Sequence, residues 1–169
     1  MPNICLNDLT VHADDSVLDR FEKVFFVDCD DDDDKDDDNK NKPRKMPTKR
    51  FSLNALVPMP KDWDAVKVEC RNGLPKWYEW CIENWGTKSV YATLCITRST
   101  RILHVAFESA WAPPLPWFKT LCETFDEEFS MTLAYEEPAM DIHGVLVCKK
   151  WKKSRDGDYF YLLQDVALP

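Results

Sequence analysis

The sequence predicts a single α+β domain in which helices cover one face of a mainly antiparallel sheet. Three observations support this class. The chain has 169 residues, the length of one ordinary domain, and 44% of them are apolar. Segments with the twofold periodicity of strands alternate with segments of helical periodicity. No repeat of 20–50 residues is visible, so we expect one domain over residues 1–169.

The first predicted unit is a strand over residues 3–11 followed by an amphipathic helix. Apolar residues recur at helical spacing between Val17 and Phe25, and charged residues occupy the other positions. The side chains of Asp14, Asp15 and Ser16 offer oxygens that can cap the start of this helix.

Residues 28–50 interrupt the pattern with an acidic run followed by a basic one. Nine of the residues from 28 to 38 are aspartate, and lysines and arginines then follow up to Arg50. Because like charges this dense repel and bury no apolar area, we expect a mobile loop. An EF-hand is disfavoured, since Asp33 stands where that loop requires glycine. A weak divalent-cation site and mimicry of a nucleic-acid backbone remain open for the acidic run.

A tryptophan-rich helix is predicted within residues 74–88, where three tryptophans fall in nine residues. Apolar residues recur at helical spacing from Leu74 to Trp85, so one face is expected in the core. Gly86 follows the last periodic residue, where a left-handed cap is favoured. The simple interpretation is a core helix, and the alternative is a binding site at the corner formed by residues 85–88.

The remaining elements complete a recognisable order. Residues 51–60 are expected to cross the core as an extended piece closed by prolines. The rest of the chain predicts a hairpin, a proline-rich corner, a helix, a strand and a terminal hairpin, at residues 90–107, 108–116, 116–125, 129–135 and 141–163 respectively. This order is the ferredoxin-like βαββαβ plan, with an inserted helix-containing segment and an added C-terminal β-hairpin.

Five segments of the chain resemble the YubB-type ferredoxin-like domain family of phage and plasmid proteins. They read PNICLNDLTV, LVPMP, WCIENWGTK, ESAWAPPLP and YEEPAM, and they occur in the order found in that family. The chain departs from the family pattern at Ile4, at Ser89 and at residues 108–111. The resemblance implies the fold and a mobile-element origin, and it assigns no reaction and no cofactor.

Composition excludes several classes of function. With 30 acidic and 22 basic residues, the chain is not expected to bind nucleic acid or anionic membranes through its overall charge. The seven cysteines form no CxxC pair, which argues against a metal or disulfide framework and favours a reducing, cytoplasmic location. The histidines His12, His104 and His143 lie in no catalytic motif, and there is no glycine-rich phosphate loop. We therefore expect no enzyme activity, no metal and no cofactor.

A non-enzymatic protein-binding role is the function that these features favour. An acidic protein of phage origin could inhibit or redirect a host defence or nucleic-acid-handling protein, because such proteins present basic grooves. The candidate contact residues are Asp30, Asp31, Asp32, Asp33, Asp34, Asp36, Asp37, Asp38, Trp80, Trp85, Thr87, Lys88 and Trp111.

A nucleic-acid-binding module is the alternative. Ferredoxin-like sheets can stack bases on exposed aromatic residues, but here the exposed face is expected to carry Tyr91 as its only large ring. The other residues expected on that face are Thr93, Cys95, His104, Ala106, Ser130 and Thr132. A basic patch on the C-terminal hairpin supports this alternative, and its residues are Lys149, Lys150, Lys152, Lys153 and Arg155.

Overall fold

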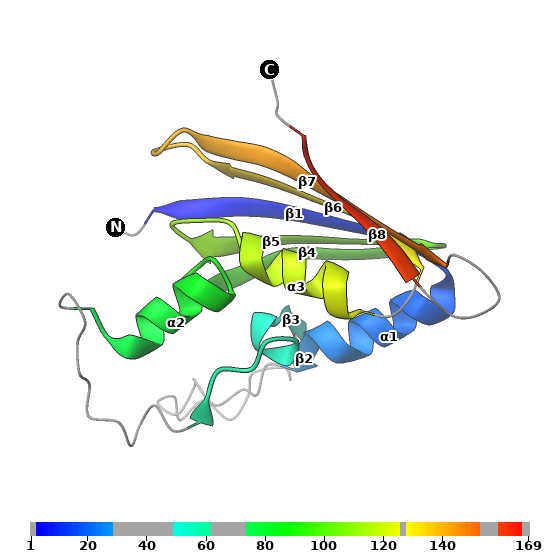
Figure 1. The fold of residues 1–169 in the computed structure, drawn as a ribbon, viewed down its shortest axis with the longest axis horizontal. Coiled ribbons are helices and arrows are strands. Elements are labelled where there is room, and N and C mark those ends of the chain that lie inside the picture. The colour runs from blue at the N-terminus through cyan, green and yellow to red at the C-terminus, as the bar shows by residue number, and fades with distance from the viewer. Residues whose placement is uncertain (1–2, 29–48, 62–73, 126–127, 153–158, 167–169) are drawn as a thin grey trace, which may run out of the picture.

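The computed structural model describes residues 3–28, 49–61, 74–125, 128–152 and 159–166. Helices α1 (Asp15–Phe25), α2 (Lys76–Asn84) and α3 (Leu115–Thr124) lie on one side of a large sheet (Figure 1). The strands of that sheet are β1 (Ile4–Ala13), β4 (Val90–Ser99), β5 (Ile102–Ala110), β6 (Phe129–Glu137), β7 (Ile142–Lys152) and β8 (Tyr159–Val166). A smaller ribbon consists of β2 (Phe26–Asp28) and β3 (Lys49–Phe51).

The six-stranded sheet has the order β4-β5-β1-β6-β7-β8, and every neighbouring pair is antiparallel. The elements β1, α1, β4, β5, α3 and β6 follow one another as βαββαβ, and β1 lies between β5 and β6. This is the ferredoxin-like arrangement, and it confirms the predicted fold class. The β7–β8 hairpin extends the sheet at the β6 edge, as the sequence predicted.

Aromatic rings fill the space between the sheet and the helices. Phe51 lies at the centre of this cluster, with its ring centroid 4.9 Å from that of Phe107 and 5.3 Å from that of Trp117. Phe25 from α1 meets the Trp117 ring edge-on at 5.7 Å. All four side chains are fully buried. Rings in tilted and edge-to-face contact add to the stabilisation that their buried area already provides.

Two tryptophans hold the short helix η1 (Leu53–Ala55) and the residues after it against this core. The Trp117 indole Nε1–H donates to the carbonyl oxygen of Leu53 at 3.0 Å, and the Trp85 Nε1–H donates to that of Val57 at 2.8 Å. Residues 51–60 therefore cross the core as predicted, but they include a helical turn and are not extended throughout. A buried indole N–H needs such a partner, and here two irregular backbone carbonyls supply it.

The predicted loop at residues 28–50 begins and ends inside regular structure. Phe26 pairs with Phe51 and Asp28 with Lys49, so the β2–β3 ribbon closes the base of the insertion. Its boundaries are thus narrower than the sequence indicated. Residues 29–48, on which the expectation of a mobile loop rests, lie outside the described residues.

Helix α2 is shorter and less buried than the tryptophan pattern predicted. It begins at Lys76, and Leu74 and Ile82 are exposed, although both were expected on the buried face. The helix packs against α3, and it does not lie beneath the centre of the sheet, so only part of its surface is covered. The predicted cap at Gly86 is confirmed, because its φ is +85° and its N–H donates to the carbonyls of Cys81 and Ile82.

Strand β4 differs from the prediction in which face its side chains occupy. Register shifts occur between Val90 and Ala92 and between Thr93 and Cys95. As a result Thr93 turns to the helix side, where its Oγ1 accepts a hydrogen bond of 2.9 Å from the Phe51 amide. Each bulge reverses the alternation that follows it, and simple counting along the sequence cannot locate it.

The predicted capping oxygens of α1 have a different role. No side chain caps this helix, although Asp14 occupies the N-cap position. Asp15 Oδ1 instead accepts hydrogen bonds from the Arg98 guanidinium at 2.8 Å and from the Arg101 amide at 2.9 Å. These contacts tie α1 to the β4–β5 turn, with Arg98 also 3.1 Å from Glu22.

Removing a buried indole should destabilise the fold much more than removing an exposed one. We expect Trp85→Ala and Trp117→Ala each to lower the free energy of unfolding by about 3–5 kcal/mol, because each creates a cavity and removes an indole hydrogen bond to a backbone carbonyl. The matched control is Trp111→Ala, whose side chain is 42% exposed. Urea unfolding followed by circular dichroism measures the three values, and equal losses would contradict the core described above.

Protonation of Asp15 should weaken the contact between α1 and the sheet. The Arg101 amide, and then the Arg98 guanidinium, lower the pKa of Asp15 below its ordinary value. A lowered pKa means that the stabilisation is complete above the ordinary carboxyl pKa and is lost as the pH falls through the lowered one. We therefore expect Asp15→Asn to reduce the melting temperature at pH 7 and to have a shrinking effect in acid.

Differential scanning fluorimetry of wild type and Asp15→Asn, at pH values from 7 into the acid range, measures the difference between their melting temperatures. The control is Glu83→Gln, since Glu83 is an exposed residue of α2. A difference between Asp15→Asn and wild type that stays constant down to the lowest pH would show that the Asp15 charge does not contribute.

Candidate functional site

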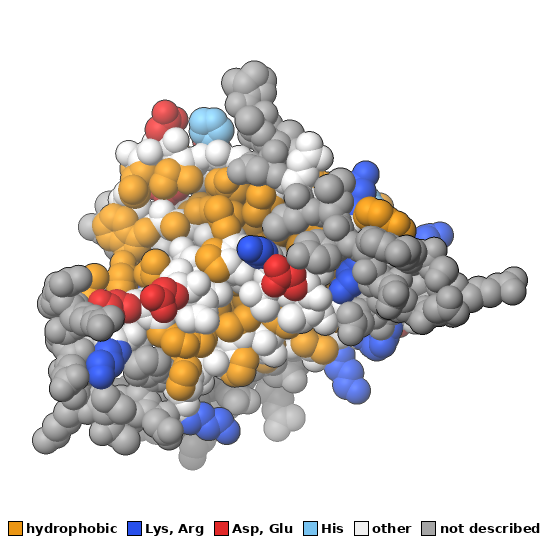
Figure 2. Space-filling model, viewed as in Figure 1, with side chains coloured by type: hydrophobic (Ala, Val, Ile, Leu, Met, Phe, Trp, Pro, Cys, Tyr) orange, Lys and Arg blue, Asp and Glu red, His pale blue; other side chains and the backbone are white. Residues whose placement is uncertain are grey.

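The candidate site lies on the face of the sheet opposite α1, α2 and α3, which we call the open face. Alternation along β1 places Leu9 and Val11 in the core and Leu6 and Asp8 on the open face. Leu6 is 45% exposed, and Leu94 from β4 is 55% exposed. Figure 2, which views the molecule from the side that carries the helices, shows acidic side chains and a histidine at the end of the sheet near the β6–β7 turn.

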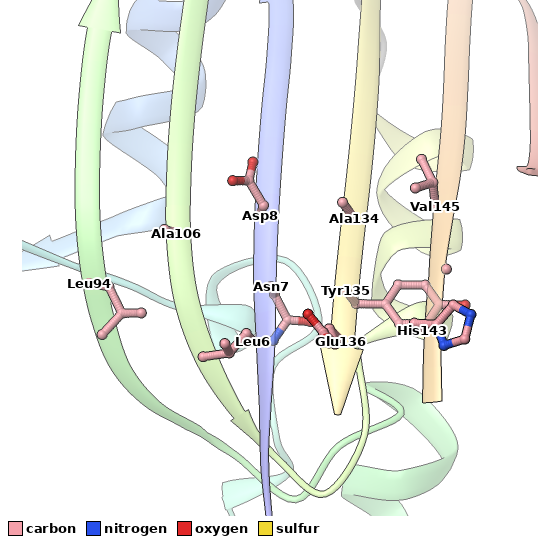
Figure 3. Close-up of a pocket in the computed structure, with 11 residues that line it drawn as sticks. Leu6, Asn7, Asp8, Leu94, Ala106, Ala134, Tyr135, Glu136, His143 and Val145 are labelled. Atoms are coloured by element: carbon pink, nitrogen blue, oxygen red, sulfur yellow. The ribbon is translucent and has the colours of Figure 1, made fainter. Parts of the chain in front are cut away.

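A groove of about 550 Å³ crosses one end of the open face (Figure 3). Leu6 and Leu94 project toward each other over β5, where the small side chain of Ala106 leaves room for them. We call this feature the acidic groove, and its side chains come from Leu6, Asp8, Leu94, Ala106, Ala134, Glu136, His143 and Val145.

Three carboxylates surround the apolar floor of the acidic groove. In the strand register, Leu6 stands opposite Glu108 on one side and opposite Glu136 on the other. Asp8 stands between Ala106 and Ala134 in the next row. Among the described residues, neither Glu108 nor Glu136 forms an ion pair. An exposed leucine between two uncompensated carboxylates suits a partner that is both apolar and basic.

Histidines flank these acids. His104 Nε2 lies 2.8 Å from Asp8 Oδ2, and His143 is the cross-strand neighbour of Glu136. His143 Nδ1 also lies 3.9 Å from Asp141, a residue of the β6–β7 turn. Two imidazoles therefore lie beside the carboxylates of the groove.

Packed polar residues on the helix side support the floor of the groove. Asn7 Nδ2 donates to Ser109 Oγ at 2.8 Å and to the Cys5 carbonyl at 3.0 Å, so β1 and β5 are linked beneath Leu6. On the neighbouring strands the Tyr135 ring covers Gly144, where a Cβ atom would overlap the ring. Because these groups are buried and paired, the groove has a rigid base.

Burial keeps two of the described cysteine thiols in their protonated form. Burial raises the pKa of the Cys5 thiol to about 11, so it stays protonated at neutral pH. Burial also raises the pKa of Cys81. Among the residues that the structure describes, no three His, Cys, Asp or Glu side chains are grouped closely enough to hold a metal ion.

The predicted tryptophan corner is mainly structural. Trp85 is only 7% exposed, Thr87 is fully buried with its Oγ1 donating to the Ala110 carbonyl at 2.8 Å, and Trp80 packs edge-on against Trp85. The Lys88 ammonium lies 5.6 Å from the Trp77 ring centroid, a cation–π contact within the protein.

Trp111 differs from the rest of that corner because it is exposed. Its φ is +70°, a left-handed conformation that is uncommon for a large side chain. Its N–H donates to the Asn3 carbonyl at 3.0 Å, which helps to hold the turn. The corner as predicted is therefore wrong for Trp85 and Thr87, and Trp111 keeps a surface that could contact a partner.

The candidate aspartates from Asp30 to Asp38 lie outside the described residues, so the structure does not test them. The same applies to Lys153 and Arg155 and to the side chain of Lys152.

The basic patch expected on the hairpin is wrong at Lys150. Its side chain is only 5% exposed, and its Nζ donates to the carbonyls of Phe125 at 2.8 Å and Glu123 at 3.4 Å, at the end of α3. The ammonium therefore satisfies the C-terminal carbonyls of a helix and cannot contact nucleic acid. Lys149 is exposed on the open face, as alternation along β7 requires.

Sequence reasoning missed the acidic groove. Leu6 lies within the strand predicted at residues 3–11, and Glu108 lies within the corner predicted at residues 108–116. The available signal was the alternation itself, because Leu6 and Asp8 lie two residues apart and must share a face. Of the residues expected on the exposed face, the strand register places Cys95, His104, Ala106, Ser130 and Thr132 on the open face. Thr93 instead lies on the helix side.

Comparison with known proteins supports the fold. Residues 91–158 match the family described as the ferredoxin-like domain in Api92-like protein. Among solved structures, the chain is similar to the protein api92 from Yersinia pseudotuberculosis, with 10% identity, a TM-score of 0.57, and coverage of 87% of this chain and 94% of that one. A likeness at this identity shows the fold alone. A comparison with curated protein sequences finds no match.

The helices in the described part of the chain include none that is long and apolar enough to cross a membrane.

The two neighbouring lysines of β7 should respond differently to neutralisation. We expect Lys150→Met to lower the free energy of unfolding by about 1–3 kcal/mol, because partly buried carbonyls at the end of α3 lose a charged donor. The matched control, Lys149→Met, should change it by less than about 0.5 kcal/mol, since Lys149 is exposed. Urea unfolding gives both values, and a result in which Lys149→Met is the more damaging would contradict the assigned orientation of β7.

Proposed function

We propose that this protein acts by binding another protein, without catalysis, and that the acidic groove is the binding site. The single observation that carries the proposal is the position of Leu6, which is exposed between Glu108 and Glu136 in the middle of a sheet. The partner suited to this site presents a basic surface with an apolar side chain at its centre.

The apolar part of the groove would supply binding energy. Fully burying a leucine side chain contributes about 1.5–3 kcal/mol, and both Leu6 and Leu94 still have about half of their surface to bury. Because Ala106 and Ala134 have small side chains, a partner could reach both leucines. A short apolar core of this kind, enclosed by polar residues, is typical of interface hot spots.

The carboxylates would supply specificity and speed of association. Glu108, Glu136 and Asp8 give the groove one sign of charge, and the whole chain is also acidic, with a net charge of −8. Electrostatic complementarity of this kind steers a basic partner toward the site and disfavours acidic competitors. The same charge disfavours direct binding of DNA or RNA at this face.

The partner class follows from that charge. Host proteins that handle nucleic acids, including defence proteins, present basic surfaces, and an acidic protein that covers such a surface would inhibit or redirect them. The mobile-element setting of this proposal rests on the sequence resemblance to phage and plasmid proteins, and the groove adds a defined surface to it. The exposed Trp111 and the aspartates of residues 30–38 stay as additional candidate contacts.

Affinity capture with matched charge variants tests the proposal. The wild-type chain, the double variant Glu108→Gln/Glu136→Gln and the control Glu83→Gln are used as baits in lysate from the host cell. We expect the wild type and the control to recover one protein complex that salt weakens, and the double variant to lose it. With the recovered partner purified, the double variant should bind at least about tenfold more weakly, a difference of 1.4 kcal/mol.

Deleting residues 28–42 tests the alternative that the acidic run is the binding site. If this deletion removes binding while Glu108→Gln/Glu136→Gln does not, the acidic run is the binding site and the acidic groove is not. Turnover of a substrate by the purified chain would contradict the non-enzymatic role.

A further inference from the structure

The two ends of the open face differ in charge. At one end the cross-strand row contains Glu108, Leu6 and Glu136. At the other end the row contains Ile102, His12, Ser130 and Lys149, and we call it the distal row. The acidic groove therefore lies at one end of a surface whose other end carries an exposed lysine and no carboxylate in that row.

Between these ends the open face carries mostly small side chains. The two middle rows consist mainly of alanine, threonine, valine and a histidine, namely Ala106, Asp8, Ala134 and Val145, then His104, Thr10, Thr132 and Val147. Side chains of this size allow a second sheet to approach to the separation of about 10 Å that is usual for stacked sheets.

The open face is large enough for a dimer. Six strands spaced about 4.8 Å apart, over rows that span about 20 Å of strand, give roughly 500–600 Å² on each copy. Two such faces bury roughly 1,000–1,200 Å² in total, which is at the lower end of the range of specific protein–protein interfaces. The face also carries exposed apolar side chains at both ends, Leu6 and Ile102 among them.

Charge selects one arrangement of two copies. If the two-fold axis ran along the strands, the row that contains Glu108 and Glu136 would face the same row of the second copy, and like charges would repel. If the axis lies in the interface at right angles to the strands, β1 of one copy lies over β1 of the other. Each distal row then covers the row of the other copy that contains Glu108 and Glu136. Lys149 then lies about one strand spacing from Glu136 of the second copy, within reach of a lysine side chain.

We propose that two copies of this chain pair through their open faces in this second arrangement, with the distal row of each over the acidic groove of the other. The pairing is isologous, because Lys149 meets Glu136 twice. A regulatory consequence follows, and it rests on the proposed function: a copy that is paired cannot offer its groove to a basic partner. Self-association and partner binding therefore compete, and dilution or a strong partner frees the groove.

Sedimentation equilibrium with charge-reversal variants tests the pairing. The full chain should show a monomer–dimer equilibrium. The single variants Glu136→Lys and Lys149→Glu should each weaken it at least about tenfold, because each places like charges together. The combined variant Glu136→Lys/Lys149→Glu restores opposite charges, so its dissociation constant should return to near that of the wild type. The control Glu83→Lys should change nothing.

Folding of each variant is checked by its thermal melt, since Glu136 and Lys149 are both exposed. A wild-type chain that stays monomeric at every concentration overturns the inference, and so does a double variant no better than the singles. If the chain stays monomeric and capture through the groove still succeeds, the inference alone fails. If the dimer forms and Glu108→Gln/Glu136→Gln captures like the wild type, the proposed function alone fails.

Discussion

The domain depends on the packing of Phe51 and Trp117 between the sheet and the helices. Their rings lie 5.3 Å apart, and the Trp117 indole also holds the Leu53 carbonyl. This contact joins α3 to the segment that follows the insertion, so a residue before the tryptophan-rich helix and one after it are fixed together. All of this aromatic volume lies on one side of the sheet, and none of the elements that the structure describes covers the opposite face.

Most of the fold could be predicted from the periodicity of the chain. The alternation of Phe129, Met131 and Leu133 and the helical spacing of residues 17–25 each led to the correct element, because burial of one face requires those patterns. The failures have local physical causes. Bulges in β4 reversed the face of Thr93, and the position of α2 beside α3 left Leu74 and Ile82 exposed. Neither feature has a signal in a single sequence.

The site was harder to predict than the fold, because its residues look like parts of the core. Leu6 has the same chemistry as Leu9, and although their spacing along β1 places the two leucines on opposite faces, the sequence does not say which face the helices cover. The conspicuous residues had structural roles instead. Trp85 and Thr87 satisfy backbone carbonyls, and Lys150 satisfies the end of α3. Residues that stand out by size or charge are thus as often required for folding as for binding.

The central claim is that β1 has one buried face and one face available to a partner. Carbene footprinting of the dilute monomer with mass spectrometry tests it most directly, because neighbouring residues of one strand serve as internal controls. Leu6 should be labelled strongly, whereas Leu9 and Val11 should be protected, in line with their burial. Equal protection of Leu6, Leu9 and Val11 would show that another layer covers the open face, and it would contradict both the binding site and the pairing inferred from it.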